Sequence, residues 1–238
     1  MINWLERTEL MVGVEKLEKL KNSHIMVAGV GGVGAYAVEQ IVRAGIGNIT
    51  IIDADVVNPS NRNRQLPALV STNGKRKIDI VRDRCLDINP NINITTSDQF
   101  LTEENIPLLY TNQKYDFVVD AIDTLTPKVH LIYETLKHNI PLISSMGAGG
   151  KLDPTKIAIA DVVDSYNCKL ARMVRKRLHK LGVRDGFSVV FSPEDVDITN
   201  VLHVDGELFK RSTVGTISYM PAIFGCYVAS HVIRELLK

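Results

Sequence analysis

The strongest constraint on the fold is a run of glycines that directly follows a short apolar segment. The four glycines behind the apolar residues 25–28 are Gly29, Gly31, Gly32 and Gly34. This order predicts a buried strand, a tight turn and a helix, the unit that opens many parallel α/β sheets. Because glycine lacks a Cβ, backbone N–H groups of such a turn can approach an anion at the positive end of the helix. The sequence therefore predicts a phosphate-binding turn at this point.

Strand and helix patterns then alternate as far as residue 144. The predicted strands cover residues 25–30, 48–53, 93–97, 117–120 and 141–144. The predicted helices cover residues 7–21, 32–44, 74–88 and 127–137. Such alternation is typical of a mostly parallel sheet with helices on both faces. We expect a Rossmann-like, doubly wound α/β fold, and a less regular C-terminal part, with strands at 157–163 and 187–191, that extends the sheet.

The length of 238 residues fits one large domain with a substantial core. We expect a nucleotide-binding half over residues 1–150 and a half over 151–238 that contacts substrate and forms a dimer. In the first predicted helix, Leu10, Val14, Leu17 and Leu20 should share a buried face. Residues 212–233 contain no Asp, Glu, Lys or Arg, and their one histidine, His231, should be neutral. The segment also includes glycine, proline and many hydroxyl groups. That composition favours a core or dimer-facing helix over a membrane span.

Composition excludes several classes of protein. A net charge of +1 gives no overall attraction to nucleic acid or membranes, so any basic surface must be local. The three cysteines are widely separated and form no CxxC pair, which favours a reducing, cytoplasmic setting and no zinc. The histidines show no metal-ligand spacing.

A second motif follows the next predicted strand. Asp53 lies about 20 residues beyond the glycine turn, where a carboxylate can accept hydrogen bonds from a ribose. Asn61, Arg62 and Arg64 follow closely. Guanidinium groups suit a triphosphate whose charge changes during reaction, whereas an NAD-dependent oxidoreductase has no need of them.

Five pieces in this order resemble the ubiquitin-activating-type adenylyltransferase superfamily. They are the glycine turn, Asp53, the Asn61-x-x-Arg64-Gln65 motif, Lys77 and the segment ending in Asp123. The resemblance implies that the glycines underlie ATP and that Asp53 holds its ribose. It implies that Asn61, Arg64 and Lys77 hold the phosphates, and that Asp123 lies beside the α-phosphate and its Mg²⁺. Arg7 matches an arginine that reaches the partner subunit's ATP, which implies a homodimer.

The second half of the chain is similar to one branch of that superfamily, the tRNA threonylcarbamoyladenosine dehydratases. The matching pieces are residues 146–154, 170–181 and 215–221. The resemblance implies that ATP activates the carboxylate of a threonylcarbamoyl group on an adenosine beside the tRNA anticodon. Ring closure with loss of water would follow.

A basic helix is the feature that separates the candidate substrates. Every charged residue from 169 to 184 is Lys or Arg. We expect an exposed face that contacts tRNA, formed by Arg172, Arg175, Lys176 and Lys180. The opposite, buried face should consist of Leu170, Val174, Leu178 and Leu181. A merely solvated face is the simpler interpretation, but contact with a phosphate backbone requires only positive charge on a rigid element.

Three alternatives to the dehydratase remain open. The chain could adenylate the C-terminal carboxylate of a small sulfur-carrier protein, act as an oxidoreductase, or serve as a nucleotide-binding scaffold. The residues also leave open whether a cysteine desulfurase or sulfur-acceptor partner is needed, and whether a monovalent cation is bound. We expect Asp120 to support the end of its strand rather than to touch ATP.

Overall fold

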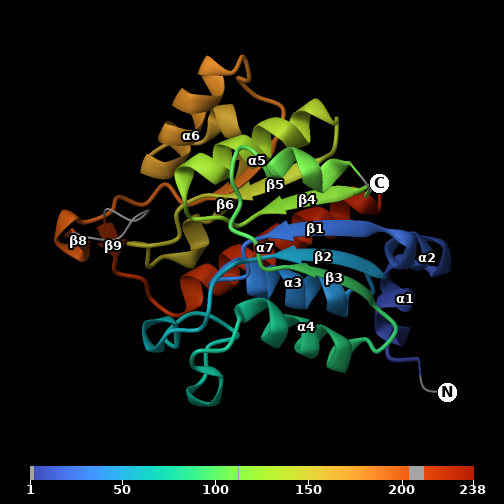
Figure 1. The fold of residues 1–238 in the computed structure, drawn as a ribbon. Coiled ribbons are helices and arrows are strands. Elements are labelled where there is room, and N and C mark those ends of the chain that lie inside the picture. The colour runs from blue at the N-terminus through green and yellow to red at the C-terminus, as the bar shows by residue number, and fades with distance from the viewer. Residues whose placement is uncertain (1–2, 112, 204–211) are drawn as a thin grey trace.

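The computed structural model describes residues 3–111, 113–203 and 212–238 (Figure 1). Its main sheet has the strand order β3-β2-β1-β4-β5-β7-β6. All neighbours in it pair in parallel except β6, which runs antiparallel to β7 at the edge. The strands are β1 (His24–Ala28), β2 (Asn48–Ile52), β3 (Asn93–Ser97), β4 (Phe117–Asp120), β5 (Leu142–Ser145), β6 (Ala158–Asp161) and β7 (Ser188–Phe191). The expected doubly wound sheet, extended by the second half of the chain, is confirmed.

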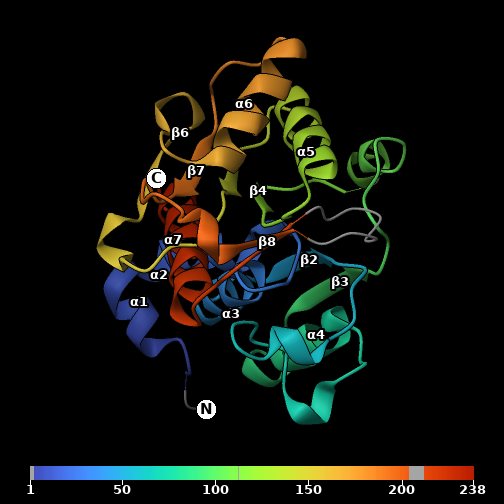
Figure 2. The same ribbon diagram turned by 90° about the vertical axis from the view of Figure 1, so that its left-hand side faces the viewer.

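Helices cover both faces of this sheet, as Figures 1 and 2 show. One face carries α3 (Gly34–Arg43), α4 (Lys77–Ile88) and α7 (Tyr219–Leu236), which share one apolar cluster with the strands. The other face carries α5 (Leu125–Lys137) and α6 (Lys169–Lys180) over a second cluster. The sheet is therefore buried on both sides, which explains the near-continuous apolar runs of its central strands.

The N-terminal segment differs from the single helix that its spacing predicts. It forms α1 (Glu6–Val12) and α2 (Val14–Asn22), separated by Gly13 at a φ of 86°. Leu17 and Leu20 are buried as expected, but Leu10 and Val14 are 83% and 63% exposed. The predicted four-residue face was wrong: Gly13, with its positive φ, separates Leu10 from the other three residues, and Val14 at the first turn of α2 is exposed as well.

The apolar C-terminal segment is a core element. It begins with β9 (Ser212–Val214), which pairs with β8 (Val201–His203), and continues into α7. α7 lies so close to α3 that a Cβ at Gly225 would stand 2.5 Å from the carbonyl oxygen of Val33. None of the helices in the described ranges is long and apolar enough to cross a membrane.

The sheet changes its direction of winding between β1 and β4. β1 pairs with β2 on one side and with β4 on the other, so that Ala28 lies level with Ile52 and Asp120. The helix after β1 covers one face and the helix after β4 covers the other, so the two connections diverge at the carboxyl ends of these strands. Ligands of open α/β sheets collect at such a switch point.

Candidate nucleotide site and basic helix

The glycine turn is held by direct contact between backbone segments. Gly29 has a φ of 88°, and a Cβ there would stand 2.8 Å from the carbonyl oxygen of Ala121, just beyond β4. A Cβ at Gly34 would overlap the carbonyl oxygen of Gly29 itself. Gly31 is free of such backbone contacts, and its nearest neighbour is the side-chain amide of Gln65 at 3.7 Å. The turn is thus tight at both ends and open at Gly31, where a phosphate can approach the backbone.

Asp53 ties this turn to the end of β2. One carboxylate oxygen accepts the Val30 N–H at 2.7 Å, and the other accepts the Asp55 N–H at 2.8 Å. Burial raises the pKa of Asp53, while the nearby Lys77 ammonium opposes that rise. The carboxylate stands at the carboxyl end of β2 beside the glycines, and its contact with a ribose stays a prediction.

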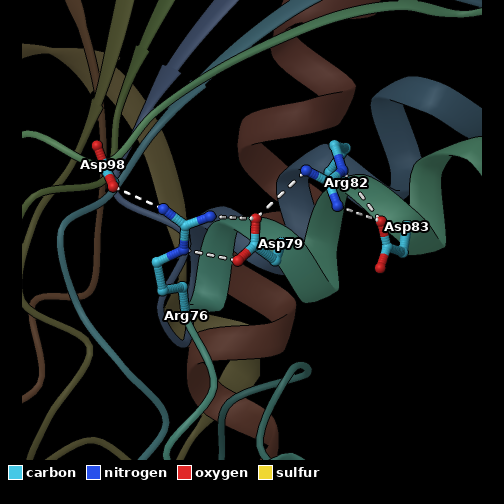
Figure 3. A network of polar contacts seen from close by, with 5 residues as sticks. All are labelled: Arg76, Asp79, Arg82, Asp83 and Asp98. Atoms are coloured by element: carbon cyan, nitrogen blue, oxygen red, sulfur yellow. Dashed lines mark hydrogen bonds and ion pairs between the residues drawn. The ribbon is translucent and has the colours of Figure 1, made fainter.

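Lys77 is buried at the start of α4 and points back to the same region. Its Nζ lies 2.7 Å from a carboxylate oxygen of Asp55, and its N–H donates to the Asp55 carbonyl at 3.0 Å. The residue before it, Arg76, is exposed and binds both Asp79 and Asp98 at 2.7 Å (Figure 3). The hydrogen bond from Arg76 lowers the pKa of Asp79. These contacts fix the first turn of α4, and with it the direction of Lys77.

The segment between β2 and α4 packs over the glycine turn. Asn61 is buried, and its side-chain oxygen accepts the Asn58 N–H at 3.0 Å. The Arg64 guanidinium donates to the Ser60 carbonyl at 2.9 Å and to the Asn63 side chain at 2.8 Å. Asn61 therefore shapes the turn, while Arg64 is held by neighbouring acceptors beside the glycines.

Gln65 shows that this pocket suits a polar ligand. Its Oε1 is buried and has no hydrogen-bond partner among the described residues, beside the open face of Gly31. A buried, unpaired polar atom costs free energy until a partner arrives. The assignment of Oε1 and Nε2 in an amide is interchangeable, so the same position can accept from a hydroxyl or donate to a phosphate.

Asp123 stands in the exposed turn after β4, next to the glycine turn that contacts Ala121. The Thr124 hydroxyl donates to its carboxylate at 3.3 Å. Glycine turn, Asp53, Lys77 and Asp123 are thus brought to one edge of the sheet.

Beneath this edge lies a buried network that the sequence analysis missed. Asp120 is fully buried and binds the Lys128 ammonium at 2.7 Å and the Ser144 hydroxyl at 2.5 Å. Lys128 also donates to the Ile122 carbonyl at 2.9 Å. Asp120 supports the strand end, as expected. Lys128 could have been found, because it shares its helical spacing with the buried Leu131 and Ile132.

Arg7 lies away from the other candidates in the same chain. It is exposed on α1, and its neighbour Leu5 packs against Gly45, which precedes β2. That is the amino edge of the sheet, opposite to the glycine turn. Arg7 therefore does not belong to the nucleotide site of its own chain.

The basic helix α6 matches its prediction in part. Val174 and Leu178 are buried, whereas Arg172, Lys176 and Lys180 are exposed. The helix ends at Lys180, ahead of Gly182 with a φ of 83°.

Arg175 departs from the exposed face that the sequence predicted. It is half-buried and donates to the carbonyls of Val162 at 3.1 Å and Ser165 at 2.7 Å, and also to the Ser165 hydroxyl. Its position along the helix lies between the buried and the exposed rows, so the long side chain folds back onto the preceding loop. On the face that the sequence predicts to be buried, Leu170 is only half-buried and Leu181 is 39% exposed.

The loops after β5 and β7 are joined by a reciprocal clasp. The buried Lys151 donates to the Glu194 carbonyl, and the Glu194 carboxylate accepts the N–H groups of Leu152 and Asp153 at 3.1 Å. Burial lowers the pKa of Lys151. The next segment along, at Thr216, accepts a hydrogen bond from Asn63 at 2.9 Å. The second half of the chain therefore touches the nucleotide site directly.

No cluster of three or more His, Cys, Asp or Glu residues suited to hold a metal ion occurs in the described ranges. A magnesium ion, however, is usually bound through one or two carboxylates and the phosphates of its nucleotide, so it needs no such cluster.

Comparison with known proteins supports the fold and identifies the family. The profile of the ThiF family matches residues 5–238. The tRNA threonylcarbamoyladenosine dehydratase of Bacillus subtilis is 40% identical over 100% of this chain and 96% of its own length. The crystal structure of the Escherichia coli tRNA N6-threonylcarbamoyladenosine dehydratase in complex with ATP is 34% identical, with a TM-score of 0.88, and the alignment covers 97% of this chain and 92% of that one.

Another adenylyltransferase matches less of the chain. The molybdopterin-synthase adenylyltransferase of Escherichia coli is 30% identical over 63% of this chain and 60% of its own length. The similarity to the dehydratases thus includes the second half of the chain, with the clasp and the basic helix.

Proposed function

Because the chain belongs to the ThiF family, we propose that it is an ATP-dependent tRNA threonylcarbamoyladenosine dehydratase. The observation that carries this proposal is the full-length similarity to dehydratases, which extends through the basic helix and both loops of the clasp. Adenylation of a sulfur-carrier protein is the weaker candidate, since its relative matches only 63% of the chain.

ATP fits the residues at the carboxyl edge of the sheet. The open middle of the glycine turn accommodates phosphate oxygens, and Asp53 beside it accepts ribose hydroxyls. Lys77 and Arg64 supply positive charge to the phosphates once they exchange their present partners, Asp55 and the Ser60 carbonyl, for the ligand. The unpaired Gln65 atom would gain a partner at the same time.

The proposed chemistry needs no side-chain nucleophile. A carboxylate oxygen of the threonylcarbamoyl group attacks the α-phosphorus, the bond to the β-phosphate breaks, and pyrophosphate leaves. An atom of the carbamoyl group then attacks the activated carboxyl carbon and closes the ring, a carbamoyl N–H proton is released, and AMP leaves with the carboxylate oxygen that is lost as water in the net reaction. Positioning and fixed positive charge supply most of the stabilisation in such transfers. Asp123 would help to hold Mg²⁺, which would neutralise charge on the phosphates.

We propose that the enzyme is a homodimer in which Arg7 completes the partner's site. Arg7 lies at the amino edge of its own sheet, and the exposed apolar residues around it, Leu10, Met11 and Val14, are 83%, 85% and 63% exposed. Apolar residues gathered on one surface are typical of an interface.

Subunit mixing tests this arrangement. Inactive Arg7→Ala and inactive Asp123→Asn proteins, once mixed, should regain part of the activity through dimers that carry one intact site. No recovery after demonstrated subunit exchange would exclude shared sites.

We also propose a cytoplasmic setting, which suits a tRNA substrate. We assign the phosphates of that tRNA to Arg172, Lys176 and Lys180.

Activity assays of the purified protein decide two further points. Activity without an added cysteine desulfurase or sulfur-acceptor protein shows whether such a partner is needed. Activity in buffers with and without potassium shows whether a monovalent cation is needed.

The decisive experiment is mass spectrometry of the modified nucleoside. Incubation with ATP, Mg²⁺ and tRNA carrying threonylcarbamoyladenosine should remove one water from that nucleoside. Asp123→Asn and Arg64→Ala should reduce the rate by about 10²-fold or more, because each acts on charge that develops at the phosphates. Unchanged circular dichroism would show that the fold survives. Consumption of ATP in the presence of a sulfur-carrier protein, with the tRNA unchanged, would favour adenylation of that protein instead.

A further inference from the structure

One face of α6 carries a hollow that the adenylation site does not use. Met173, Lys176, Arg177 and Lys180 line it. They recur at helical spacing, so they lie along one outward side of the helix, opposite the buried Val174 and Leu178. Met173 is 42% exposed, a large apolar surface among three cations.

The cations of this hollow differ from the charges on another helix of the same chain. On α4, Arg76 and Arg82 are paired with Asp79, Asp83 and Asp98 (Figure 3). In the described part of the chain, Lys176, Arg177 and Lys180 form no ion pair, and α6 contains no acidic residue. Mixed charges on α4 are satisfied within the protein, whereas the charge on α6 is left for a polyanion.

The hollow is connected to the turn that carries Asp123. The Arg177 guanidinium donates to the Thr126 hydroxyl at 2.8 Å. Thr126 lies in the first turn of α5, two residues beyond Thr124, whose hydroxyl contacts Asp123. The hydrogen bond restrains the guanidinium at the border between α6 and the start of α5.

We propose that this hollow holds one unpaired nucleotide of the tRNA strand that flanks the modified adenosine. Its base packs on Met173 and stacks against the Arg177 guanidinium, and its flanking phosphates bind Lys176 and Lys180. RNA-binding proteins recognise single-stranded loops in this way, with splayed bases on apolar or guanidinium surfaces. The inference rests on the proposed function, since it assigns a path to the same tRNA.

The charged half of the proposal is tested by salt titration. Binding of a fluorescent anticodon stem–loop RNA is measured for the parent and for Lys176→Gln/Lys180→Gln. Loss of two contacts to a single strand should lower the slope of log K against log salt by about 1.4. The matched control is Lys16→Gln/Lys19→Gln, which removes two exposed lysines from α2 at the opposite edge of the sheet. Equal slopes in all three proteins would overturn the phosphate assignment.

The proposed stacking of a base on Met173 and Arg177 predicts a loss of RNA affinity without a change in salt dependence. Met173→Ala and Thr126→Val change no charge, so each should weaken RNA binding several-fold, on the order of threefold to tenfold, while the salt slope stays that of the parent. Affinity for ATP should stay unchanged in both. Parent-like RNA binding by both variants would exclude a base in the hollow.

The outcome is separable from the proposed function. If the parent removes water from the modified nucleoside and the hollow variants bind RNA as the parent does, only the path is wrong. If the parent removes no water but the variants still lose RNA affinity, the hollow is an RNA surface of an enzyme with another activity.

Discussion

Two glycine-containing loops follow parallel strands of the same sheet, and they hold their shape by different means. In the turn after β1, Gly29 and Gly34 are required because the nearest atoms are backbone atoms of Ala121 and of the turn itself. In the loop after β5, Gly149 and Gly150 face side chains of other segments, namely Val214 at the end of β9, Thr216 and Val196. Backbone cannot move aside without unfolding its strand, but a surface side chain can.

The same contrast appears in the lysines that support the two loops. Lys128, below the first loop, is fully buried and pairs with the fully buried Asp120. Lys151, in the second loop, is also buried, but its acceptor is the carbonyl of Glu194 in a partly exposed segment. We infer that the glycine turn after β1 is rigid before ATP binds, whereas the loop after β5 can adjust its shape when the tRNA substrate binds.

The largest expected effect concerns Lys128. Lys128→Met leaves the Asp120 carboxylate buried without its cation, which should cost about 3–5 kcal/mol of unfolding free energy. Urea denaturation measures it. The double variant Asp120→Asn/Lys128→Met removes both charges and should regain most of the loss. If Lys128→Met costs less than about 1 kcal/mol, the size expected for an exposed ion pair, the buried pair of Asp120 and Lys128 does not support the turn.

The next effect separates the two loops directly. Gly34→Ala forces the turn after β1 to open, and loss of one or two hydrogen bonds to a charged phosphate, about 1.5–3 kcal/mol each, should lower ATP affinity by about 10²-fold. Calorimetry should show that loss in ATP affinity. Gly149→Ala places a methyl group 3.1 Å from the Val214 side chain, which can shift, so its ATP affinity should stay within about twofold of the parent. Equal losses in the two variants would remove the distinction between the loops.

The sequence alone predicted the elements that local patterns determine. The order of strands and helices, the glycine turn and Asp53 all follow from spacing within about 25 residues. The break at Gly13 was missed because the apolar spacing of Leu10 and Val14 continues across it, and only the observed φ reveals the change of direction. A single glycine in a helical pattern is often tolerated, so the pattern could not decide.

Contacts between distant segments could not be predicted in the same way. Arg175 was assigned to the exposed face of α6, yet its guanidinium binds the loop at Val162 and Ser165. Long basic side chains cover several ångströms of surface, so their position on a helix does not fix where the charge lies. The partner of Lys151 likewise depends on how the loops after β5 and β7 meet.

The smallest expected effect concerns Lys151, and its size depends on pH. Lys151→Met removes one hydrogen bond to a carbonyl that water can reach, so it should cost only about 1 kcal/mol near neutral pH, far less than Lys128→Met. Because burial lowers the pKa of Lys151, the unfolded chain binds more protons than the folded chain between that lowered value and the ordinary lysine value of about 10.4. The contribution of Lys151 to stability should therefore increase as the pH rises through this window. The difference in unfolding free energy between parent and Lys151→Met should widen accordingly, whereas Lys156→Met, which removes an exposed lysine of the same loop, should stay parallel to the parent. A difference that narrows with rising pH would mean that the ammonium, rather than the neutral amine, is the form that the clasp stabilises.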